Sequence, residues 1–340
     1  MRGGRPGPMK IGVVGGTGNI STSFVKLLLQ LGHEVVCFNR GESGPVPEGA
    51  RVIRGDRRAD RAGFERAVQA ERFDAAIDMI CYTREDAESS LRAFRGVGHF
   101  VHCSTVCTYG VRRDWLPVTE DHPLYPVSDY GRRKLEADSL FLEAHYREGF
   151  PTTIIKPAMT YGPKLGMLRQ ISWEFSWIDR IRKGKPIVVC GDGNALCQQL
   201  HVDDAAACFA YILGRPRAFG QIYNMVAREV RTWADYHRTM MQVLGREVEL
   251  VGVPFEDLLA LDIPASHNLR DEFAYHTFYS AEKLFRDVPE FGPRIPLAEG
   301  MAQVVEAMDR DGRIPNSDEI EWEDRVIAAQ RQVRQAQPHR

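Results

Sequence analysis

The sequence predicts an α/β protein with a doubly wound parallel sheet and a smaller C-terminal α/β domain. Three observations lead to this fold class. Short apolar runs rich in β-branched residues alternate with helical stretches over residues 10–160. The runs are continuously apolar, as is typical of parallel strands that are buried on both faces. A glycine-rich turn joins the first run to the first helical stretch, so the chain shows the βαβ rhythm of a doubly wound fold from its start.

The first half of the chain contains most of the expected elements. The run "KIGVVG" is expected as the first strand, and "STSFVKLLLQLG" follows it as an amphipathic helix. Further strands are expected, in order, in "HEVVCFNR", "RVIRGD", "FDAAIDMICY", "HFVHCSTV" and "TTIIKPA". Beyond residue 160 the alternation loosens into a tryptophan-bearing helical segment, "RQISWEFSWIDRIRKG", then the run "PIVVCGDG" and a helix-rich end.

These patterns divide the chain into four expected regions. Residues 1–8 are rich in Gly, Pro and Arg and are expected to be a disordered tail. Residues 9–160 mainly form the doubly wound domain, and residues 161–315 mainly form the second domain, with some exchange of strands and helices between the two. Residues 316–340 are charged and Gln-rich, which predicts a polar C-terminal helix or tail.

Composition limits the class of protein. The formal charge of −2 gives no overall field that would attract nucleic acid or an anionic membrane, and no apolar run reaches the length of a membrane span. No hydrophobic signal segment follows the start, "MRGGRPGPMK". The seven cysteines include no CxxC pair, so we expect reduced thiols, no disulfide framework and no metal site. We therefore expect a soluble, cytoplasmic protein that binds neither nucleic acid nor membranes.

The glycine turn "GGTGNIS" lies at the first strand-to-helix junction, where a doubly wound fold binds a pyrophosphate. Glycines allow a tight turn and a close approach of the backbone, and the positive end of the following helix attracts the anion. Ser21 replaces the last glycine of the usual spacing, and a purely structural turn is the alternative. The residues expected to contact a dinucleotide here are Gly15, Gly16, Thr17, Gly18, Asn19 and Ile20.

The type of dinucleotide is read at the end of the second strand. A carboxylate there would bind the adenosine ribose of NAD, but this chain has Asn39 followed by Arg40. A guanidinium suits the 2′-phosphate of NADP, so NADP is the preferred expectation and NAD the alternative. Asp56 follows the third strand and is placed to contact the adenine; Arg57 and Met79 are expected to add cofactor contacts.

The segment "YGRRK" contains a pair of residues suited to proton transfer. Tyr130 and Lys134 are four residues apart, so on a helix their side chains share one face. A lysine cation beside a phenol lowers its pKa, which lets the tyrosine act as an acid or base at neutral pH. This spacing is common by itself. Together with the glycine turn and with Thr105 at the end of the preceding strand, it is far more specific.

This combination resembles the extended short-chain dehydrogenase/reductase family, in particular its NAD-dependent epimerases and dehydratases that modify nucleotide sugars. The resemblance covers residues from about Lys10 to about Val305 and implies a Rossmann-like dinucleotide-binding domain followed by a substrate-binding domain. It implies that Tyr130 transfers the proton, that Lys134 lowers its pKa and binds the nicotinamide ribose, and that Thr105 hydrogen-bonds the reacting oxygen. Pro157 in "KPAMTYGP" is similar to the family's residue beside the nicotinamide.

The chain departs from the family pattern next to Thr105. Dehydratases that remove a sugar 6-hydroxyl carry Asp-Glu there, whereas this chain has Val106 and Cys107, so that activity is not expected. Some related epimerases carry a cysteine at the position of Cys107, where a thiol of suitable pKa takes a proton from a carbon beside a carbonyl. The alternative is that Cys107 only packs. The acid expected on the opposite side is replaced by Trp173.

Substrate anchoring also departs from the pattern. The resemblance implies two arginines that clamp a nucleotide diphosphate, but Cys197 occupies the first of these positions and only Arg270 matches the second. Lys164 or Arg169 would have to supply the missing charge. The expected substrate is therefore a nucleotide sugar bound with different cations, or a sugar or other polyol without the diphosphate.

The sequence thus predicts an NAD(P)-dependent epimerase that works on a sugar, expected to be nucleotide-linked, through a transient keto intermediate. An NADPH-dependent keto-sugar reductase is the first alternative. A non-catalytic NAD(P)- or RNA-binding relative is the second, against which the intact set of Thr105, Tyr130 and Lys134 argues. The expected partner is the small-molecule substrate, and a homodimer is common in the family.

Overall fold

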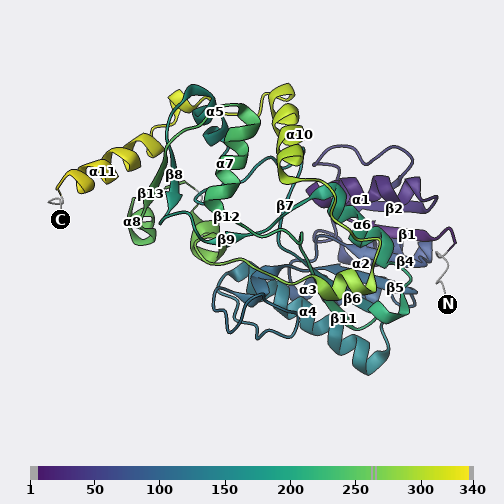
Figure 1. Cartoon of the computed structure of the whole chain (residues 1–340). Helices are drawn as coiled ribbons and strands as arrows, with labels where there is room; N and C mark the ends of the chain where they lie inside the picture. Colours follow the sequence, from purple (N-terminus) through teal and green to yellow (C-terminus); the bar gives the residue numbers. More distant parts are fainter. Residues whose placement is uncertain (1–6, 262, 265, 337–340) are drawn as a thin grey trace. The chain divides into compact units, whose positions relative to one another are not determined.

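The computed structural model describes residues 7–261, 263–264 and 266–336 (Figure 1). Most of the expected N-terminal tail and the last four residues lie outside these ranges. The chain divides into two compact units, each built from three segments. Unit 1 contains Met1–Thr160, Leu200–Arg228 and Tyr279–Arg294, and unit 2 contains Tyr161–Gln199, Glu229–Phe278 and Ile295–Arg340. The chain passes between the units at five points, of which the first two lie in the short strands β7 (Met159–Tyr161) and β10 (Gln199–His201).

Unit 1 is built on a seven-stranded parallel sheet in the order β11-β6-β5-β4-β1-β2-β3. This order reverses between β1 and β4, as in a doubly wound fold. The central register places Val13 of β1 beside Cys37 of β2 and Ile77 of β4. The strands are β1 (Lys10–Val14), β2 (Glu34–Asn39), β3 (Arg51–Arg54), β4 (Ala75–Asp78), β5 (His99–Cys103), β6 (Thr152–Pro157) and β11 (Gln221–Met225).

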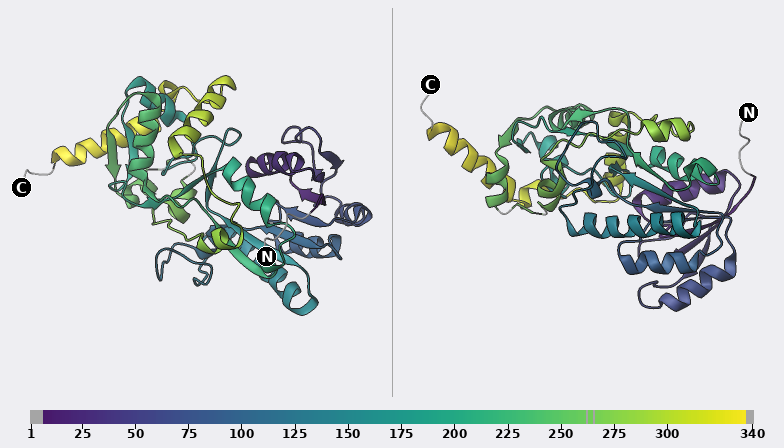
Figure 2. Two further views of the ribbon diagram at one scale, coloured as in Figure 1. Left: turned by 45° about the vertical axis from the view of Figure 1, so that its right-hand side comes forward. Right: turned by 90° about the horizontal axis from the view of Figure 1, so that it is seen from below.

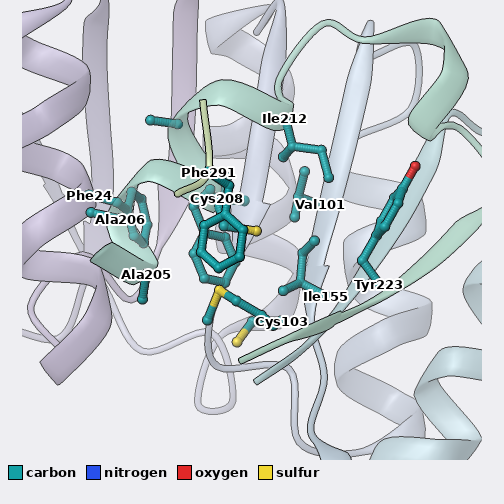
Figure 3. Packing of buried hydrophobic residues seen from close by; sticks show 14 of the residues in the cluster. Phe24, Val101, Cys103, Ile155, Ala205, Ala206, Cys208, Ile212, Tyr223 and Phe291 are labelled. Carbon is teal, nitrogen blue, oxygen red and sulfur yellow. The ribbon is translucent and has the colours of Figure 1, made fainter. Parts of the chain in front are cut away.

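Helices cover both faces of this sheet (Figure 2). One face carries α1 (Asn19–Gln30) and α6 (Val202–Ile212), which pack on each other; Figure 3 shows Phe24 of α1 and Ala206 of α6 in this cluster. The rings of Phe24 and Phe209 stack with their centroids 5.4 Å apart. The other face carries α2 (Arg61–Glu71), α3 (Arg84–Ala93) and α4 (Asp129–Glu148) around a cluster of phenylalanines. The short elements η1 (Val106–Tyr109), η2 (Pro216–Ala218) and α9 (Glu282–Asp287) complete unit 1. The predicted Rossmann-like fold class is confirmed.

Side-chain caps fix where the helices near the sheet edge begin. Ser128 accepts a hydrogen bond from the Gly131 N–H at the start of α4, and Thr83 accepts one from the Asp86 N–H at the start of α3. Asp60 caps α2 in the same way. The Ser128 cap therefore fixes the first turn of α4, and this turn contains Tyr130.

Unit 2 is a smaller mixture of short strands and helices. Strands β8 (Ile187–Cys190) and β13 (Leu250–Val253) pair in parallel, and β9 (Leu196–Cys197) pairs antiparallel with β12 (Arg231–Thr232). Its helical elements are α5 (Ser176–Lys183), α7 (Trp233–Leu244), α8 (Phe255–Ala260), the π-helix η3 (Leu269–Phe273), α10 (Leu297–Arg310), η4 (Ser317–Glu319) and α11 (Trp322–Ala336). The last helix lies in the stretch for which a polar helix or tail is expected.

The helix expected from residue 169 begins only at Ser176. The side chains before it are held by other parts of unit 2. Arg169 forms a doubly hydrogen-bonded ion pair with Glu323, and Gln170 donates to the Phe273 carbonyl and accepts from the Cys190 N–H. These fixed partners keep residues 169–175 out of the helix, which corrects the prediction for this stretch.

Among the described residues, no helix is both long enough and apolar enough to cross a membrane. Nor does the described part of the chain hold three or more His, Cys, Asp or Glu side chains in an arrangement that would bind a metal ion.

Candidate active site

The carboxyl ends of the parallel strands in unit 1 bring the predicted residues to one edge of the sheet. The glycine turn follows β1, Met79 follows β4, and Thr105 follows β5. Strands β1 and β4 are neighbours at the point where the strand order reverses, which is where ligands bind in doubly wound folds. Helix α4 supplies Tyr130 and Lys134.

The glycine turn requires glycine at its first two positions. Gly15 has φ +86°, and a Cβ atom there would lie 2.7 Å from the Ile80 side chain. A Cβ atom on Gly16 would lie 2.5 Å from the Cys37 sulfur. Ser21, in place of a third glycine, accepts a 2.7 Å hydrogen bond from the Gly18 N–H and so caps α1.

Asn39 supports this turn from the end of β2. Its side-chain oxygen accepts from the Gly16 N–H at 3.1 Å, and its amide nitrogen donates to the Thr17 hydroxyl at 2.8 Å. The Asn39 side chain is therefore engaged within the protein, and Arg40 is the residue of this pair that faces outward, with a side chain that is 55% exposed. The sequence did not reveal this division of roles.

The turn has a feature that fits a bound dinucleotide. Both polar atoms of the Asn19 side chain, at the start of α1, are buried and have no hydrogen-bond partner among the described residues. A buried amide in this position is suited to binding a phosphate, which would also accept hydrogen bonds from the backbone N–H groups at the start of the helix. The glycines and Asn19 thus fit the pyrophosphate of NAD(P).

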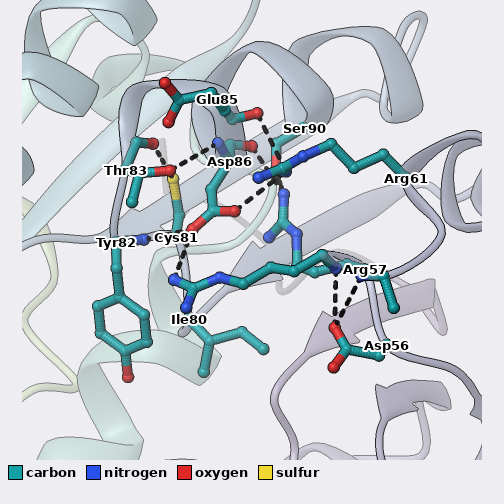
Figure 4. Close-up of polar contacts among 12 residues, drawn as sticks. Asp56, Arg57, Arg61, Ile80, Cys81, Tyr82, Thr83, Glu85, Asp86 and Ser90 are labelled. Atoms are coloured by element: carbon teal, nitrogen blue, oxygen red, sulfur yellow. Dashed lines mark hydrogen bonds and ion pairs between the residues drawn. The ribbon is translucent and has the colours of Figure 1, made fainter.

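Arg57 has a different place from the one predicted (Figure 4). Its guanidinium lies inside unit 1, 5% exposed, where it donates to Asp78 at 2.6 Å, to Ser90 at 2.8 Å and to the Asp86 carbonyl at 2.7 Å. These contacts join the loop after β3 to α3. They occupy the Arg57 guanidinium, so we do not expect this side chain to bind the cofactor.

Asp56 and Met79 lie in the two loops beside the turn. Asp56 accepts hydrogen bonds from the Arg58 and Ala59 N–H groups, which, with Arg40 at 3.9 Å, hold its pKa below the usual value. The Met79 N–H donates to the Val14 carbonyl at 3.0 Å, which ties the loop after β4 to the glycine turn.

The predicted catalytic residues come together between η1 and α4. Thr105 caps η1 by accepting from the Cys107 N–H at 3.2 Å, and its side chain hydrogen-bonds Tyr130. Lys134 is 1% exposed and donates to the Cys103 carbonyl at 2.6 Å, with its Nζ 5.9 Å from the centre of the Tyr130 ring. A Cβ atom on Gly131 would lie 2.6 Å from the Cys107 carbonyl oxygen, so glycine is needed for this close approach of α4.

Tyr130 is 44% exposed, but the desolvation of its hydroxyl and the neighbouring Cys107 thiol raise its pKa, and the hydrogen bond with Thr105 only partly opposes this. This direction is opposite to the lowering that the sequence predicts from Lys134. The cause is the desolvation of the phenol, which outweighs the groups that stabilise the phenolate. At neutral pH the phenol of Tyr130 is therefore protonated.

A buried polar network that the sequence did not reveal supports this region. Asp138 of α4 accepts from the Ser104 hydroxyl at 2.9 Å and lies 3.1 Å from Lys156 Nζ and 3.3 Å from His102 Nε2. Lys156 also donates to the Thr108 hydroxyl at 2.7 Å. Burial acts to raise the pKa of Asp138, but Lys156, His102 and Ser104 overcome this and hold it below its usual value.

The two cysteines of the η1 region differ in burial. Burial raises the pKa of Cys103 to about 11, which makes it an unreactive packing residue at neutral pH. Cys107 is only partly buried and lies beside Thr105. A reactive role for Cys107 stays a prediction.

Apart from Thr105, the predicted substrate contacts lie in unit 2. Arg270, on η3, is 60% exposed and pairs with Asp271 at 2.8 Å. Burial lowers the pKa of Lys164. Arg169 is fully buried against Glu323, and Cys197 is 1% exposed. Arg169 is therefore unable to replace a missing diphosphate anchor while this pair is intact.

Tyr82 is an aromatic residue of the site that the sequence analysis overlooked. It follows β4, and its ring lies 4.8 Å from Lys134 Nζ and 6.3 Å from the Tyr130 ring. The sequence did offer one signal for it, which is an aromatic residue in the loop after β4, a strand that ends where the strand order reverses.

Comparisons with known proteins agree with this geometry. The model of the "NAD dependent epimerase/dehydratase family" matches residues 11–225, well over half of the chain. A 2'-dehydrokanamycin reductase from Streptomyces kanamyceticus is 32% identical over 73% of this chain and 70% of its own. The chloroplast stem-loop binding protein of 41 kDa b from Arabidopsis thaliana is 28% identical over 86% of this chain and 77% of its own.

Among solved structures, a UDP-glucose 4-epimerase from Thermotoga maritima with UDP-glucose superposes with a TM-score of 0.72. It is 20% identical, and the match covers 89% of this chain and 99% of that one, so it supports the fold. The family resemblance and the enzyme class predicted from the glycine turn and from Thr105, Tyr130 and Lys134 are confirmed by the family match. The chain belongs to the NAD dependent epimerase/dehydratase family.

Proposed function

We propose that this protein is an NADPH-dependent reductase of a keto sugar. The observation that carries the proposal is the assembly of Thr105, Tyr130 and Lys134 beside a glycine turn that fits a dinucleotide. When bound, NADPH supplies the hydride. A protonated phenol is the form that gives a proton to a carbonyl oxygen, and Tyr130, whose pKa is raised, is in this form at neutral pH.

The roles of the three residues follow from their positions. Tyr130 donates its phenolic proton to the substrate oxygen, and the Thr105 hydroxyl, which hydrogen-bonds Tyr130 in the free protein, turns to donate to the same oxygen. Lys134 places a positive charge near the phenol and stabilises the phenolate that remains after the proton leaves. Ser104 is not suited to replace Thr105, since it is 3% exposed and donates to the buried Asp138.

The choice of NADP over NAD rests on Arg40. Its guanidinium is 55% exposed, and its ion pairs with Glu42 and Asp56 are long, at 3.4 and 3.9 Å. Exposed pairs of this kind contribute little free energy, so the guanidinium is available to a 2′-phosphate. Gly15, Gly16, Thr17, Gly18, Asn19 and Ile20 would hold the pyrophosphate, and Asp56, Met79, Lys134 and Pro157 would complete the cofactor contacts.

The substrate that unit 2 supports best is a sugar without a nucleotide diphosphate. Cys197 occupies the place of one expected arginine and Arg169 is held by Glu323, so the exposed Arg270 is the one predicted arginine that is left to bind a diphosphate. A diphosphate requires exposed cations that are able to turn toward it. The similarity to 2'-dehydrokanamycin reductase supports a keto group on a larger glycoside as the reacting centre.

Epimerisation, the function predicted first from the sequence, is the second candidate. Cys107 favours it, because this partly buried residue lies beside Thr105, where a thiolate would be able to remove a proton from a carbon next to a carbonyl. A reductase consumes one NADPH for each product, whereas an epimerase regenerates its cofactor. The two candidates therefore differ in stoichiometry.

The test uses the full chain with NADPH and a panel of free keto sugars, keto glycosides and keto nucleotide sugars in deuterated water. We expect stoichiometric loss of NADPH absorbance with a member of the panel that lacks the diphosphate. Tyr130→Phe should lower kcat by about 10²–10⁴-fold. Tyr146→Phe, an exposed tyrosine further along α4, serves as the matched control and should leave kcat unchanged.

Two results would replace the proposal. Conversion without net NADPH loss, with Cys107-dependent solvent deuterium on carbon, would establish the epimerase. Binding of NADPH and of RNA, with activity on no member of the panel and no effect of Tyr130→Phe, would support the non-catalytic alternative that the stem-loop binding relative represents.

A further inference from the structure

Tyr82 lies where two loops of unit 1 meet the catalytic helix. In Figure 4 its ring points away from the polar cluster around Asp86. The ring centre is 4.8 Å from Lys134 Nζ and 5.7 Å from the Arg58 guanidinium, and the rings of Tyr82 and Tyr130 are 6.3 Å apart. Tyr82 is 39% exposed, whereas Lys134 is 1% exposed.

The backbone of Tyr82 is fixed by a buried carboxylate. The Asp86 side chain is fully buried and accepts from the Tyr82 N–H at 3.1 Å. Arg58 and Arg61 bind the same carboxylate at 3.1 and 3.0 Å, and Thr83 caps the helix that carries it. These contacts hold the start of the Tyr82 side chain in one place, so the position of its ring is set by the protein itself.

The position of the Lys134 ammonium depends on fixed groups around it. Its ammonium ends a flexible four-carbon stem and carries three donors, of which one is directed at the Cys103 carbonyl. A cation within about 6 Å of an aromatic centre is attracted to the ring face, most strongly where water is excluded. The ring of Tyr82 lies nearer to Lys134 Nζ than the Tyr130 ring does, at 4.8 Å against 5.9 Å.

We propose that Tyr82 is a positioning residue for the reaction, and that its ring holds the Lys134 ammonium between the Cys103 carbonyl and Tyr130. This inference rests on the proposed catalytic function of Tyr130. It requires the aromatic ring of Tyr82 and does not require the hydroxyl. Arg58, which also lies near the ring, is half exposed and bound to Asp86, so it has the smaller role.

The kinetic test compares two substitutions that separate ring from hydroxyl. Tyr82→Phe keeps the ring and should retain kcat within about twofold. Tyr82→Leu removes it and should lower kcat by about 2- to 30-fold with little change in KM, which corresponds to the strength of a cation–aromatic contact. The limb of the pH profile that belongs to Tyr130 should also move to higher pH in Tyr82→Leu, because a displaced ammonium stabilises the phenolate less.

A spectroscopic test needs no turnover. In protein labelled with ¹³C at the lysine ε-carbon, the protons of this carbon in Lys134 lie near an aromatic face, and ring current displaces their signal. Lys134→Met identifies the signal. We expect the displaced signal to persist in Tyr82→Phe and to return to the ordinary lysine position in Tyr82→Leu. Tyr146→Leu, at a 74% exposed tyrosine of α4, should leave it unchanged.

Two outcomes would overturn the inference. One is an unmoved Lys134 signal in Tyr82→Leu, and the other is a Tyr82→Phe variant as slow as Tyr82→Leu, which would assign the role to the hydroxyl. Thermal unfolding of each variant establishes that it folds. Failure of the proposed function would look different, since the wild type would then be inactive on every substrate while the Lys134 signal still depended on Tyr82.

Discussion

Asp138 in unit 1 and Glu323 in unit 2 are both carboxylates buried beside basic side chains, and the two clusters have different consequences. In unit 1, Asp138 binds Lys156, Ser104 and His102, and Lys156 also donates a hydrogen bond to the Thr108 hydroxyl in η1. In unit 2, Glu323 at the start of α11 binds Arg169 at 2.6 Å and Arg180 at 3.4 Å, and it accepts from the Val188 N–H of β8.

The difference lies in what each cluster is connected to. Thr108 donates to the Thr105 carbonyl, so the cluster of unit 1 extends to a residue that touches the substrate in the proposed reaction. The cluster of unit 2 fastens a C-terminal helix to a strand, and it keeps Arg169 away from solvent. Similar chemistry therefore borders the proposed catalytic residues in one unit and fastens a helix in the other.

The largest expected effect comes from breaking the cluster of unit 2. Glu323→Gln leaves Arg169 buried without a counter-charge and leaves Arg180 with Asp324 alone, which should lower the free energy of unfolding by about 3–5 kcal/mol. Denaturant unfolding measures this, and kcat of the folded fraction should stay at the wild-type value. Asp324→Asn is the control, because Asp324 is half exposed and its pair with Arg180 should contribute less than about 1 kcal/mol. A loss of kcat in Glu323→Gln would remove the contrast between the clusters.

Breaking the cluster of unit 1 should affect both stability and activity. Asp138→Asn keeps the shape but replaces charged hydrogen bonds, which should cost about 2–3 kcal/mol of unfolding free energy and also lower kcat. The folded-state pKa of Asp138 is below its ordinary value of 3.8. The contribution of the carboxylate to stability is therefore complete above that value and is lost as the pH falls through the lower folded pKa.

This sign gives a second measurement on the same variant. The stability difference between wild type and Asp138→Asn should be constant near neutral pH and should shrink below about pH 4. A difference that grows on acidification would mean that Asp138 is not held ionised by Lys156.

The smallest expected effect concerns an exposed cation of unit 1. Arg40→Ala should weaken NADPH binding by about tenfold and leave NADH binding unchanged, because only NADPH has the 2′-phosphate. Fluorescence titration of each cofactor measures this. Arg84→Ala is a matched control, since Arg84 is 56% exposed against 55% for Arg40 and pairs with Glu88 on α3. Equal weakening of both cofactors would show that Arg40 does not distinguish them.

The sequence predicts unit 1 much better than unit 2. Apolar runs form most of its strands, and this local pattern is enough to identify β1, β2, β4, β5 and β6. Strand β11, "QIYNM", has no such run and joins the sheet only through its pairing with β6, far away in sequence. The helix expected over residues 169–184 is shortened for the same reason, because the partners of Arg169 and Gln170 are distant.

The candidate site follows the same rule. Thr105, Tyr130 and Lys134 were predictable because their spacing reflects one strand end and one helix face. The buried places of Asn39 and Arg57 depend on contacts between separate segments. The raised pKa of Tyr130 and the position of Tyr82 also depend on contacts between separate segments, and a local sequence pattern does not predict such contacts.

The three-segment construction of unit 1 has a consequence for how the protein is made. Its sheet is complete only when β11 joins β6, and the segment Tyr279–Arg294 also belongs to the unit. During synthesis, a chain that ends near residue 160 carries the whole catalytic set but exposes β6 as an unpaired edge. Closing the unit then requires long-range contacts, which form slowly. Nascent chains between these lengths are thus the stage at which this protein is most exposed to aggregation.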